Sequence, residues 1–157
     1  MSKHTSDINW LQLDFQLCFR LYAAGRAMTR AYQPLLANLD LTYPQYLVML
    51  VLWEGDGITV KALGERLQLD SGTLTPLLKR LEGAGHVVRR RNPADEREVM
   101  LRLTESGRAL REKAVAVPPA LMKLTGLDLD QAKTLSQLLD TLLASLARNT
   151  PGTESGA

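Results

Sequence analysis

The chain has 157 residues, of which 45% are hydrophobic and 23% charged, and a formal net charge of +2, so we expect one globular domain. A single cysteine excludes an intrachain disulfide framework. With only 2 histidines, no cluster has metal-ligand spacing, and we expect neither a metal nor another cofactor. The N-terminus lacks the apolar core of a secretion signal, and the longest apolar run, Tyr46 to Trp53, is too short to span a bilayer. A reducing, cytoplasmic location without a membrane partner fits these features.

Positive charge is concentrated in one segment. Lys79 to Arg111 contains nine basic and five acidic residues, so the rest of the chain is slightly negative. A local basic patch on a nearly neutral protein favours a docking surface for a polyanion, with a solvated face of mixed charge as the alternative.

Apolar residues recur every three or four positions from about Ile8 to Leu36, which predicts a long amphipathic first helix. They are Leu11, Phe15, Cys18, Tyr22, Gly25, Met28, Tyr32 and Leu35. With a start near Ile8, Cys18 would lie too deep in the helix for the N-terminal dipole to act on its sulfur.

A second helix is predicted from Thr42, which has the N-cap residue type, with Pro44 in the first turn and Gln45 placed for a capping box. Gly55 and Gly57 end it. Because this segment is almost wholly apolar, we expect it at the centre of the core.

Two shorter helices follow in a helix-turn-helix pattern, one capped by Thr59 over Val60 to Leu67 and one capped by Asp70 over Ser71 to Ala84. Four leucines of the second fall within one narrow arc and fix its inward side: Leu74, Leu77, Leu78 and Leu81.

The outward side of that helix has the composition of a recognition helix. It carries Ser71, Gly72, Thr73, Thr75, Pro76, Lys79 and Arg80. Short side chains at the N-terminal end allow a close approach to base edges in a major groove, and the cations farther along reach phosphates. Pro76 is tolerated because the hydrogen bond it removes lies near the helix start.

Two short β-type runs, "VVRRR" and "EVMLRL", joined by "NPADER", predict a basic hairpin. Arg89, Arg90 and Arg91 lie on one arm, with Asp95 and Arg97 at the tip. An arginine in a narrow minor groove meets enhanced negative potential, and a neighbouring Asp can orient its guanidinium. A helix-turn-helix followed by a basic wing favours binding to double-stranded DNA.

Thr104 is expected to cap a helix to about Ala116, which Pro118 and Pro119 interrupt. The final helix carries a leucine stripe: Leu135, Leu138, Leu139, Leu142, Leu143 and Leu146. A dimer seam is the favoured use of this stripe, and packing across its own domain is the alternative.

The predicted fold is mostly α with a small β-hairpin wing, a winged helix-turn-helix that is dimeric through its N- and C-terminal helices. Its parts are a dimerisation and sensor helix (1–38), the winged helix-turn-helix (39–112), C-terminal dimerisation helices (113–149) and a disordered tail (150–157).

This order of elements resembles the MarR (multiple antibiotic resistance regulator) family over nearly the whole chain. The segments "QLCFRLYAAGRAMTRAYQPLL", "LTYPQYLVMLVLWE" and "LDSGTLTPLLKRLE" are similar to its peroxide-sensing branch, the organic hydroperoxide resistance regulators. The resemblance implies that Cys18 is the sensing cysteine, with Tyr32 and Tyr43 as its partners. It also implies a homodimer that represses a peroxidase gene until an organic hydroperoxide oxidises the cysteine. Many members have a second, resolving Cys, which this chain lacks.

Cys18 and Tyr32 are separated by 14 positions, or about 21 Å along a helix, so they cannot touch within one chain. The resemblance therefore requires a second chain with an antiparallel first helix, whereas Tyr43 is free to come from either chain. Without a resolving Cys, a sulfenic acid can form a mixed disulfide with a small cellular thiol, cyclise to a sulfenamide or over-oxidise.

Two other functions stay open. The same DNA-binding fold can respond to a small phenolic or lipophilic ligand with Cys18 merely packing. A thiol-dependent peroxidase is disfavoured, because neither a resolving Cys nor a convincing base accompanies Cys18.

Overall fold

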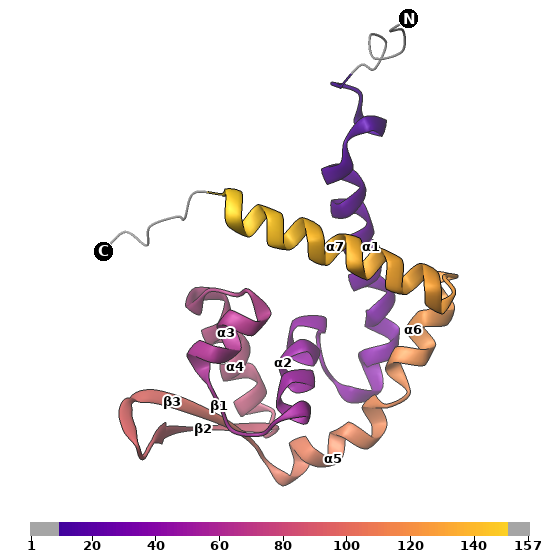
Figure 1. Cartoon of the computed structure of the whole chain (residues 1–157). Coiled ribbons are helices and arrows are strands. Elements are labelled where there is room, and N and C mark those ends of the chain that lie inside the picture. Colours follow the sequence, from indigo (N-terminus) through magenta and orange to yellow (C-terminus); the bar gives the residue numbers. More distant parts are fainter. Residues whose placement is uncertain (1–9, 151–157) are drawn as a thin grey trace, which may run out of the picture. The chain divides into compact units, whose positions relative to one another are not determined.

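A computed structural model describes residues 10–150 of the chain (Figure 1). The helices are α1 (Leu17–Leu36), α2 (Tyr43–Glu54), α3 (Val60–Leu67), α4 (Ser71–Gly83), α5 (Glu105–Ala114), α6 (Val117–Thr125) and α7 (Leu129–Asn149). The strands are β1 (Ile58–Thr59), β2 (Val87–Asn92) and β3 (Asp95–Leu103), and short 3-10 helices cover Leu13–Phe15 and Ala37–Leu39. The chain divides between Leu121 and Met122 into two units. The predicted fold class, mostly α with a small β wing, is confirmed.

Side-chain caps begin several helices at the predicted residues. Thr42 and Gln45 form a capping box at α2, in which the N–H of Thr42 donates to Oε1 of Gln45 at 2.8 Å. Thr59, Asp70 and Thr104 each accept a hydrogen bond from the backbone N–H three residues on, at 2.7 to 3.0 Å. Each cap satisfies a donor that the first helical turn leaves without an intrahelical partner, so these local patterns determine where the helices begin.

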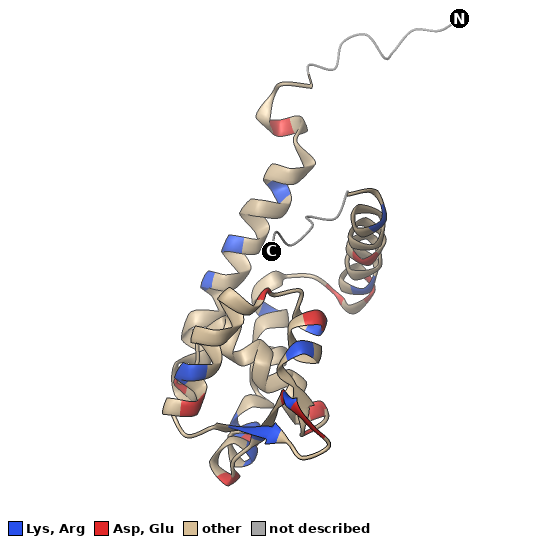
Figure 2. Ribbon diagram, turned by 90° about the vertical axis from the view of Figure 1, so that its left-hand side faces the viewer, with Lys and Arg blue, Asp and Glu red and all other residues tan. Residues whose placement is uncertain are grey.

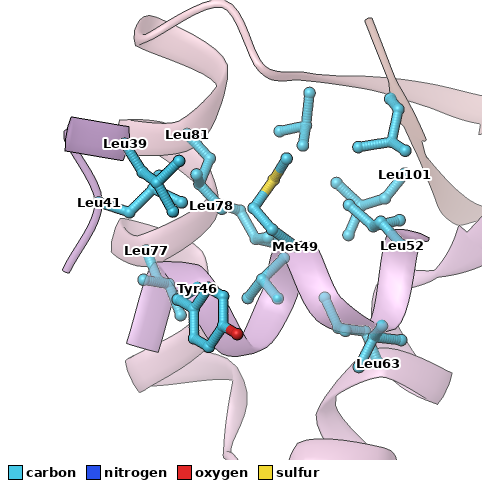
Figure 3. Close-up of a cluster of buried hydrophobic side chains, with 14 of the residues drawn as sticks. Leu39, Leu41, Tyr46, Met49, Leu52, Leu63, Leu77, Leu78, Leu81 and Leu101 are labelled. Carbon is cyan, nitrogen blue, oxygen red and sulfur yellow. The ribbon is translucent and has the colours of Figure 1, made fainter. Parts of the chain in front are cut away.

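The apolar helix α2 lies in the core of the first unit, as predicted. Figure 3 shows its side chains Met49 and Leu52 among leucines from the neighbouring elements. Those leucines include Leu63 of α3, Leu78 and Leu81 of α4 and Leu101 of β3, all of them buried. Burying one such side chain stabilises the fold by about 1.5 to 3 kcal/mol, so α2 anchors both the helix-turn-helix and the sheet.

The small sheet has three antiparallel strands in the order β1-β3-β2. The predicted hairpin is β2 and β3, whose register pairs Val87 with Leu103 and shifts between Arg91 and Asn92. Strand β1 pairs Ile58 with Leu101 and was not predicted. Two residues are too few to show the alternation from which a strand is recognised.

The first helix begins later than predicted. Leu13–Phe15 is a 3-10 helix, Gln16 is extended, and α1 starts at Leu17. Ile8, where the prediction began, lies outside the described residues. The apolar spacing continues across the break because periodicity records which side chains favour burial, and it does not record the backbone angles between them.

The break between α5 and α6, the two helices that follow the wing, also differs from the predicted one. Helix α5 ends at Ala114, and α6 begins at Val117 with Pro118 and Pro119 in its first turn. A first-turn residue has no intrahelical acceptor for its N–H, so the two prolines fit the start of a helix. They therefore begin α6 and do not interrupt α5.

The second unit consists mainly of α7. A capping box begins this helix, with the N–H of Gln131 donating to Oδ1 of Asp128 at 2.8 Å. Its leucine stripe is largely uncovered in one chain: Leu135, Leu138, Leu143 and Leu146 are exposed. Of the predicted tail 150–157, all but Thr150 lies outside the described residues.

Within residues 10–150, no group of three or more His, Cys, Asp or Glu side chains could hold a metal ion. Over the same range no single helix is long and apolar enough to cross a membrane, although Leu17–Leu39 and Tyr43–Glu54 pass that test together as a pair bent by 66°.

Candidate nucleic-acid interface and thiol site

Helix α4 has two chemically different sides. Its leucines at positions 74, 77, 78 and 81 are buried against the core. The residues of this helix that were predicted to contact DNA are all exposed: Ser71, Thr73, Thr75, Pro76, Lys79 and Arg80. The helix continues through Pro76 to Gly83, so the proline does not break it. The orientation predicted for this helix is confirmed.

The N-terminal end of α4 borders a groove of about 530 Å³ on the surface of α3. Lys61, Gln68 and Ser71 are among its lining residues, and Gln68 ends α3 in the left-handed conformation with φ of 54°. Lys61 and Gln68 were not predicted as site residues. In helix-turn-helix proteins the first helix, here α3, crosses the DNA backbone. The exposed cation Lys61 in the first turn of α3 was therefore the signal from which a phosphate contact could have been predicted.

The arginines of β2 do not form one uniform basic surface. The guanidinium of Arg89 is half-buried and lies against the carboxylate of Glu82 on α4, with Nε and Nη2 at 3.0 and 2.9 Å from Oε2. These hydrogen bonds, with one from the backbone N–H of Arg89, lower the pKa of Glu82 and keep it an anion. Arg90 and Arg91 are exposed. Arg89, which was predicted to meet DNA together with Arg91, therefore already has a partner within the protein.

The tip of the wing presents Arg97 to solvent. Its side chain is 95% exposed, and Nε lies 3.8 Å from Oδ1 of Asp95. The same Oδ1 accepts the backbone N–H of Arg97 at 3.1 Å, and Asn92 donates to Oε2 of Glu98 at 2.9 Å across the turn. Positive and negative residues are thus mixed along the hairpin (Figure 2). Asp95 restrains the backbone at Arg97 more closely than it restrains the guanidinium.

Asp56, in the turn between α2 and β1, connects the sheet to α5. Its Oδ1 accepts the N–H of Leu103 at 2.8 Å, and its Oδ2 accepts Nη2 of Arg108 at 2.9 Å. Partial burial would raise the pKa of Asp56, but these hydrogen bonds and the charges of Arg108 and Arg102 outweigh it and lower the pKa. The ionised carboxylate therefore holds the end of β3 beside the start of α5.

The thiol of Cys18 is exposed in the first turn of α1. The prediction that it lies too deep for the helix dipole is wrong, because α1 begins at Leu17 and not near Ile8. The N–H groups of a first turn carry partial positive charge, which favours a nearby anion. Phe15 and Phe19 are exposed on either side, so the surroundings of the thiol are apolar.

Tyr32 and Tyr43 stack on one another within the chain, with ring centroids 4.5 Å apart, and Tyr46 lies against Tyr32 at 5.7 Å. Burial, together with the two neighbouring phenols, raises the pKa of Tyr32 to about 12, and burial raises the pKa of Tyr43. Both hydroxyls therefore remain protonated donors near neutral pH. Tyr43 therefore lies beside the Tyr32 of its own chain.

Cys18 does not reach this tyrosine pair. Cys18 and Tyr32 belong to the same continuous helix, 14 residues apart, which corresponds to about 21 Å. Figure 1 shows the N-terminal half of α1 extending away from the helix-turn-helix. One chain therefore carries both halves of the predicted thiol site and does not bring them together.

Comparison with known proteins agrees with the fold. The family model described as transcriptional regulator SarA/Rot matches residues 30–114. The organic hydroperoxide resistance transcriptional regulator of Bacillus subtilis is 51% identical over 136 residues, covering 87% of this chain and 92% of the relative.

Two solved structures match most of the chain. The structure of reduced AbfR bound to DNA has a TM-score of 0.71 and 39% identity, and the match covers 85% of this chain and 93% of AbfR. A MarR point mutant from E. coli, in complex with operator DNA, has a TM-score of 0.74 and 31% identity, with 81% and 93% covered. These proteins are transcriptional regulators, so nothing in the comparison supports the peroxidase alternative. The chain belongs to the MarR family of winged-helix transcriptional regulators, in the branch of the organic hydroperoxide resistance regulators.

Proposed function

We propose that this chain acts in the cytoplasm as a homodimeric repressor that leaves its operator when an organic hydroperoxide oxidises Cys18. The observation that carries the proposal is the position of Cys18 in a chain 51% identical to the Bacillus regulator. In one chain the thiol is exposed in the first turn of the amphipathic helix α1, beside the apolar side chains of Phe15 and Phe19.

The DNA-binding part of the proposal rests on α4 and the wing. Short side chains lead α4, Lys79 and Arg80 follow, and Arg97 extends from the hairpin tip. These positions suit base edges, phosphates and a minor groove respectively. AbfR and the E. coli MarR mutant were each solved with DNA, which supports the same use of this fold here. A symmetric dimer would bind a pseudo-palindromic operator.

The dimer is proposed from α1 and α7. Both helices expose apolar side chains that one chain does not cover, including Leu17, Phe19 and Met28 of α1 and Leu138 of α7. An antiparallel second α1 would bring its Tyr32 and Tyr43 to Cys18 across the 21 Å that separates them within one chain (about 14 residues at 1.5 Å each). Two phenolic donors would then stabilise the sulfur anion.

The proposed chemistry is a two-electron oxidation of sulfur. The thiolate attacks the terminal oxygen of the hydroperoxide and the O–O bond breaks. The leaving alkoxide takes up the proton that the thiol had released, so an alcohol leaves and Cys18 becomes a sulfenic acid. A small thiol then attacks this sulfur and water leaves, which gives a mixed disulfide. Either product adds bulk to a packed helix interface and would change the spacing of the two recognition helices.

Mass spectrometry tests this chemistry. Protein treated with cumene hydroperoxide and then with glutathione should carry a glutathione adduct on the peptide that contains Cys18, and dithiothreitol should remove it. An unmodified Cys18 under conditions that release the protein from DNA would refute the redox proposal.

A second candidate function is a response to a small apolar ligand. A cavity of about 230 Å³ lies between α2, α5 and the start of α6, and it is lined by Tyr46, Leu50, Trp53 and Arg111 among others. Release from DNA by a phenolic acid, with Cys18 reduced throughout, would support this alternative.

A further inference from the structure

The end of α4 and the start of the wing are joined by one ion pair. Glu82 is the last residue but one of α4, and Arg89 is the third residue of β2. Both oxygens of the carboxylate are used: Oε1 accepts the backbone N–H of Arg89 at 3.2 Å, and Oε2 accepts its Nε at 3.0 Å and lies 2.9 Å from Nη2. Three contacts therefore connect two residues that belong to different elements.

The hydrogen bond from the backbone N–H of Arg89 shows that Glu82 and Arg89 are joined by more than the attraction between their charged side chains. Strand β2 lies at an edge of the three-stranded sheet, so its outward N–H groups have no strand to bond. Glu82 supplies the acceptor at Arg89. The two side chains are only 35% and 33% exposed, which shields the pair from solvent more than the pairs at Arg66 and Arg97.

We propose that Glu82 and Arg89 are positioning residues that fix the wing to the recognition helix, and that Arg89 does not contact DNA phosphate. The proposal rests on the DNA-binding function inferred above. It replaces the sequence-based assignment of Arg89 as a DNA contact and leaves Arg91 in that role.

Two consequences follow for DNA binding. A guanidinium already neutralised by a carboxylate displaces few counterions from a polyanion, so Arg89 should add little to the salt dependence of binding. A fixed angle between α4 and the wing allows both to engage one duplex without an entropic cost of alignment at binding. Loss of the pair should therefore weaken operator binding more than binding to random sequence.

In the Glu82→Gln variant, a positioning role and a purely electrostatic effect of Glu82 change the operator affinity in opposite directions. It removes a negative charge near DNA, so electrostatics alone predicts tighter binding to every duplex. The positioning role predicts that affinity for an operator, selected in vitro from random duplexes, falls about fivefold to tenfold, which corresponds to about 1 to 1.4 kcal/mol. Affinity for a random duplex should not fall.

Salt dependence gives a second readout with a matched control on the same strand. Arg91→Ala should lower the slope of log affinity against log salt by about one unit per subunit, whereas Arg89→Ala should leave the slope unchanged while weakening operator binding. The double variant with Glu82→Gln and Arg89→Ala should bind nearly as well as Arg89→Ala alone, because both changes break the same contact.

The Arg89→Lys variant retains the charge and removes the two-nitrogen contact, so it keeps the test valid if Arg89→Ala folds poorly. A positioning role predicts weakened operator binding for Arg89→Lys, whereas a phosphate contact predicts the affinity of the parent. A slope lowered in Arg89→Ala as in Arg91→Ala, or an operator bound more tightly by Glu82→Gln, would overturn the inference. A parent protein that binds no duplex would overturn the proposed function first, and this inference with it.

Discussion

The winged helix-turn-helix and the first helix, α1, differ in how much of their apolar surface a single chain buries. In α3, α4 and β3 the side chains of Leu63, Leu81 and Leu101 are fully buried, and caps and ion pairs within the chain hold the surface residues in place. In α1, by contrast, Phe19 and Met28 are exposed, and Cys18 lies far from the tyrosine pair of its own chain.

This difference separates the two parts of the proposed function. The framework of the proposed DNA-reading surface is built from contacts within one chain. A thiol site completed only by a second chain can change the geometry between chains without unfolding either of them. Oxidation of Cys18 in α1 can therefore change the arrangement of the two chains at little cost to the stability of either fold.

The largest expected effect is a loss of stability in the winged helix-turn-helix, whose core a single chain buries. A Cβ added at Gly107, in the first turn of α5, would overlap the backbone oxygen of His86 and lie 3.0 Å from its carbonyl carbon. Trp53 donates to the carbonyl of Gly107 at 2.9 Å, so the backbone cannot shift freely. Gly107→Ala should lower the free energy of unfolding by about 3 kcal/mol in urea denaturation.

Gly83 at the end of α4 is the matched control, because a Cβ there meets no heavy atom within 4 Å. Gly83→Ala should leave stability unchanged or raise it by about 0.5 to 1 kcal/mol. Equal stability of the two variants would contradict the close contact between α5 and the backbone of His86 just before β2.

The wing tip should carry the next largest effect. Arg97→Ala should cost roughly 1 to 3 kcal/mol of operator affinity if this side chain reads the minor groove. Asp95→Ala should cost less, because Asp95 restrains mainly the backbone and lies 3.8 Å from the guanidinium. Fluorescence anisotropy measures both, and a parental affinity for Arg97→Ala would remove the tip from the interface.

Lys79 should contribute a smaller effect that does not depend on sequence. As an exposed cation on α4 it is expected to meet a phosphate, so Lys79→Ala should weaken binding to operator and random duplexes alike. The salt slope should fall by about one unit per subunit, and a slope equal to that of the parent would contradict the assignment.

The smallest effects are expected at Tyr32 and Tyr43. Tyr32→Phe and Tyr43→Phe each remove one donor from the proposed thiol site, so oxidation of Cys18 by cumene hydroperoxide should slow while DNA binding persists. Stopped reactions followed by mass spectrometry give the rates. Rates equal to that of the parent in both variants would show that the tyrosines do not act on the sulfur.

Where a feature depends on neighbours in sequence, the prediction was accurate. Thr42, Thr59 and Asp70 cap their helices because a cap needs only a side chain and the N–H three residues on. The exposed side of α4 followed from helical geometry once its leucines fixed the buried side.

Features that depend on distant contacts or on backbone angles were missed. Strand β1 exists only because β3 is beside it, and the extended Gln16 leaves no mark on the apolar spacing that places Cys18. Glu82 is seven positions before Arg89, and only the turn between α4 and β2 brings the two together. The stacking of Tyr43 on Tyr32 likewise requires the chain to reverse between α1 and α2.

The most direct test of the central claim is release from operator DNA, followed by fluorescence anisotropy, for the parent and for Cys18→Ser. Serine is nearly isosteric with cysteine and can still accept hydrogen bonds from tyrosine, so both proteins should bind the operator with similar affinity. Cumene hydroperoxide with glutathione should release the parent and leave Cys18→Ser bound, because an alcohol cannot follow the oxidation steps of sulfur. Equal release of the two proteins would contradict the account and assign Cys18 a packing role.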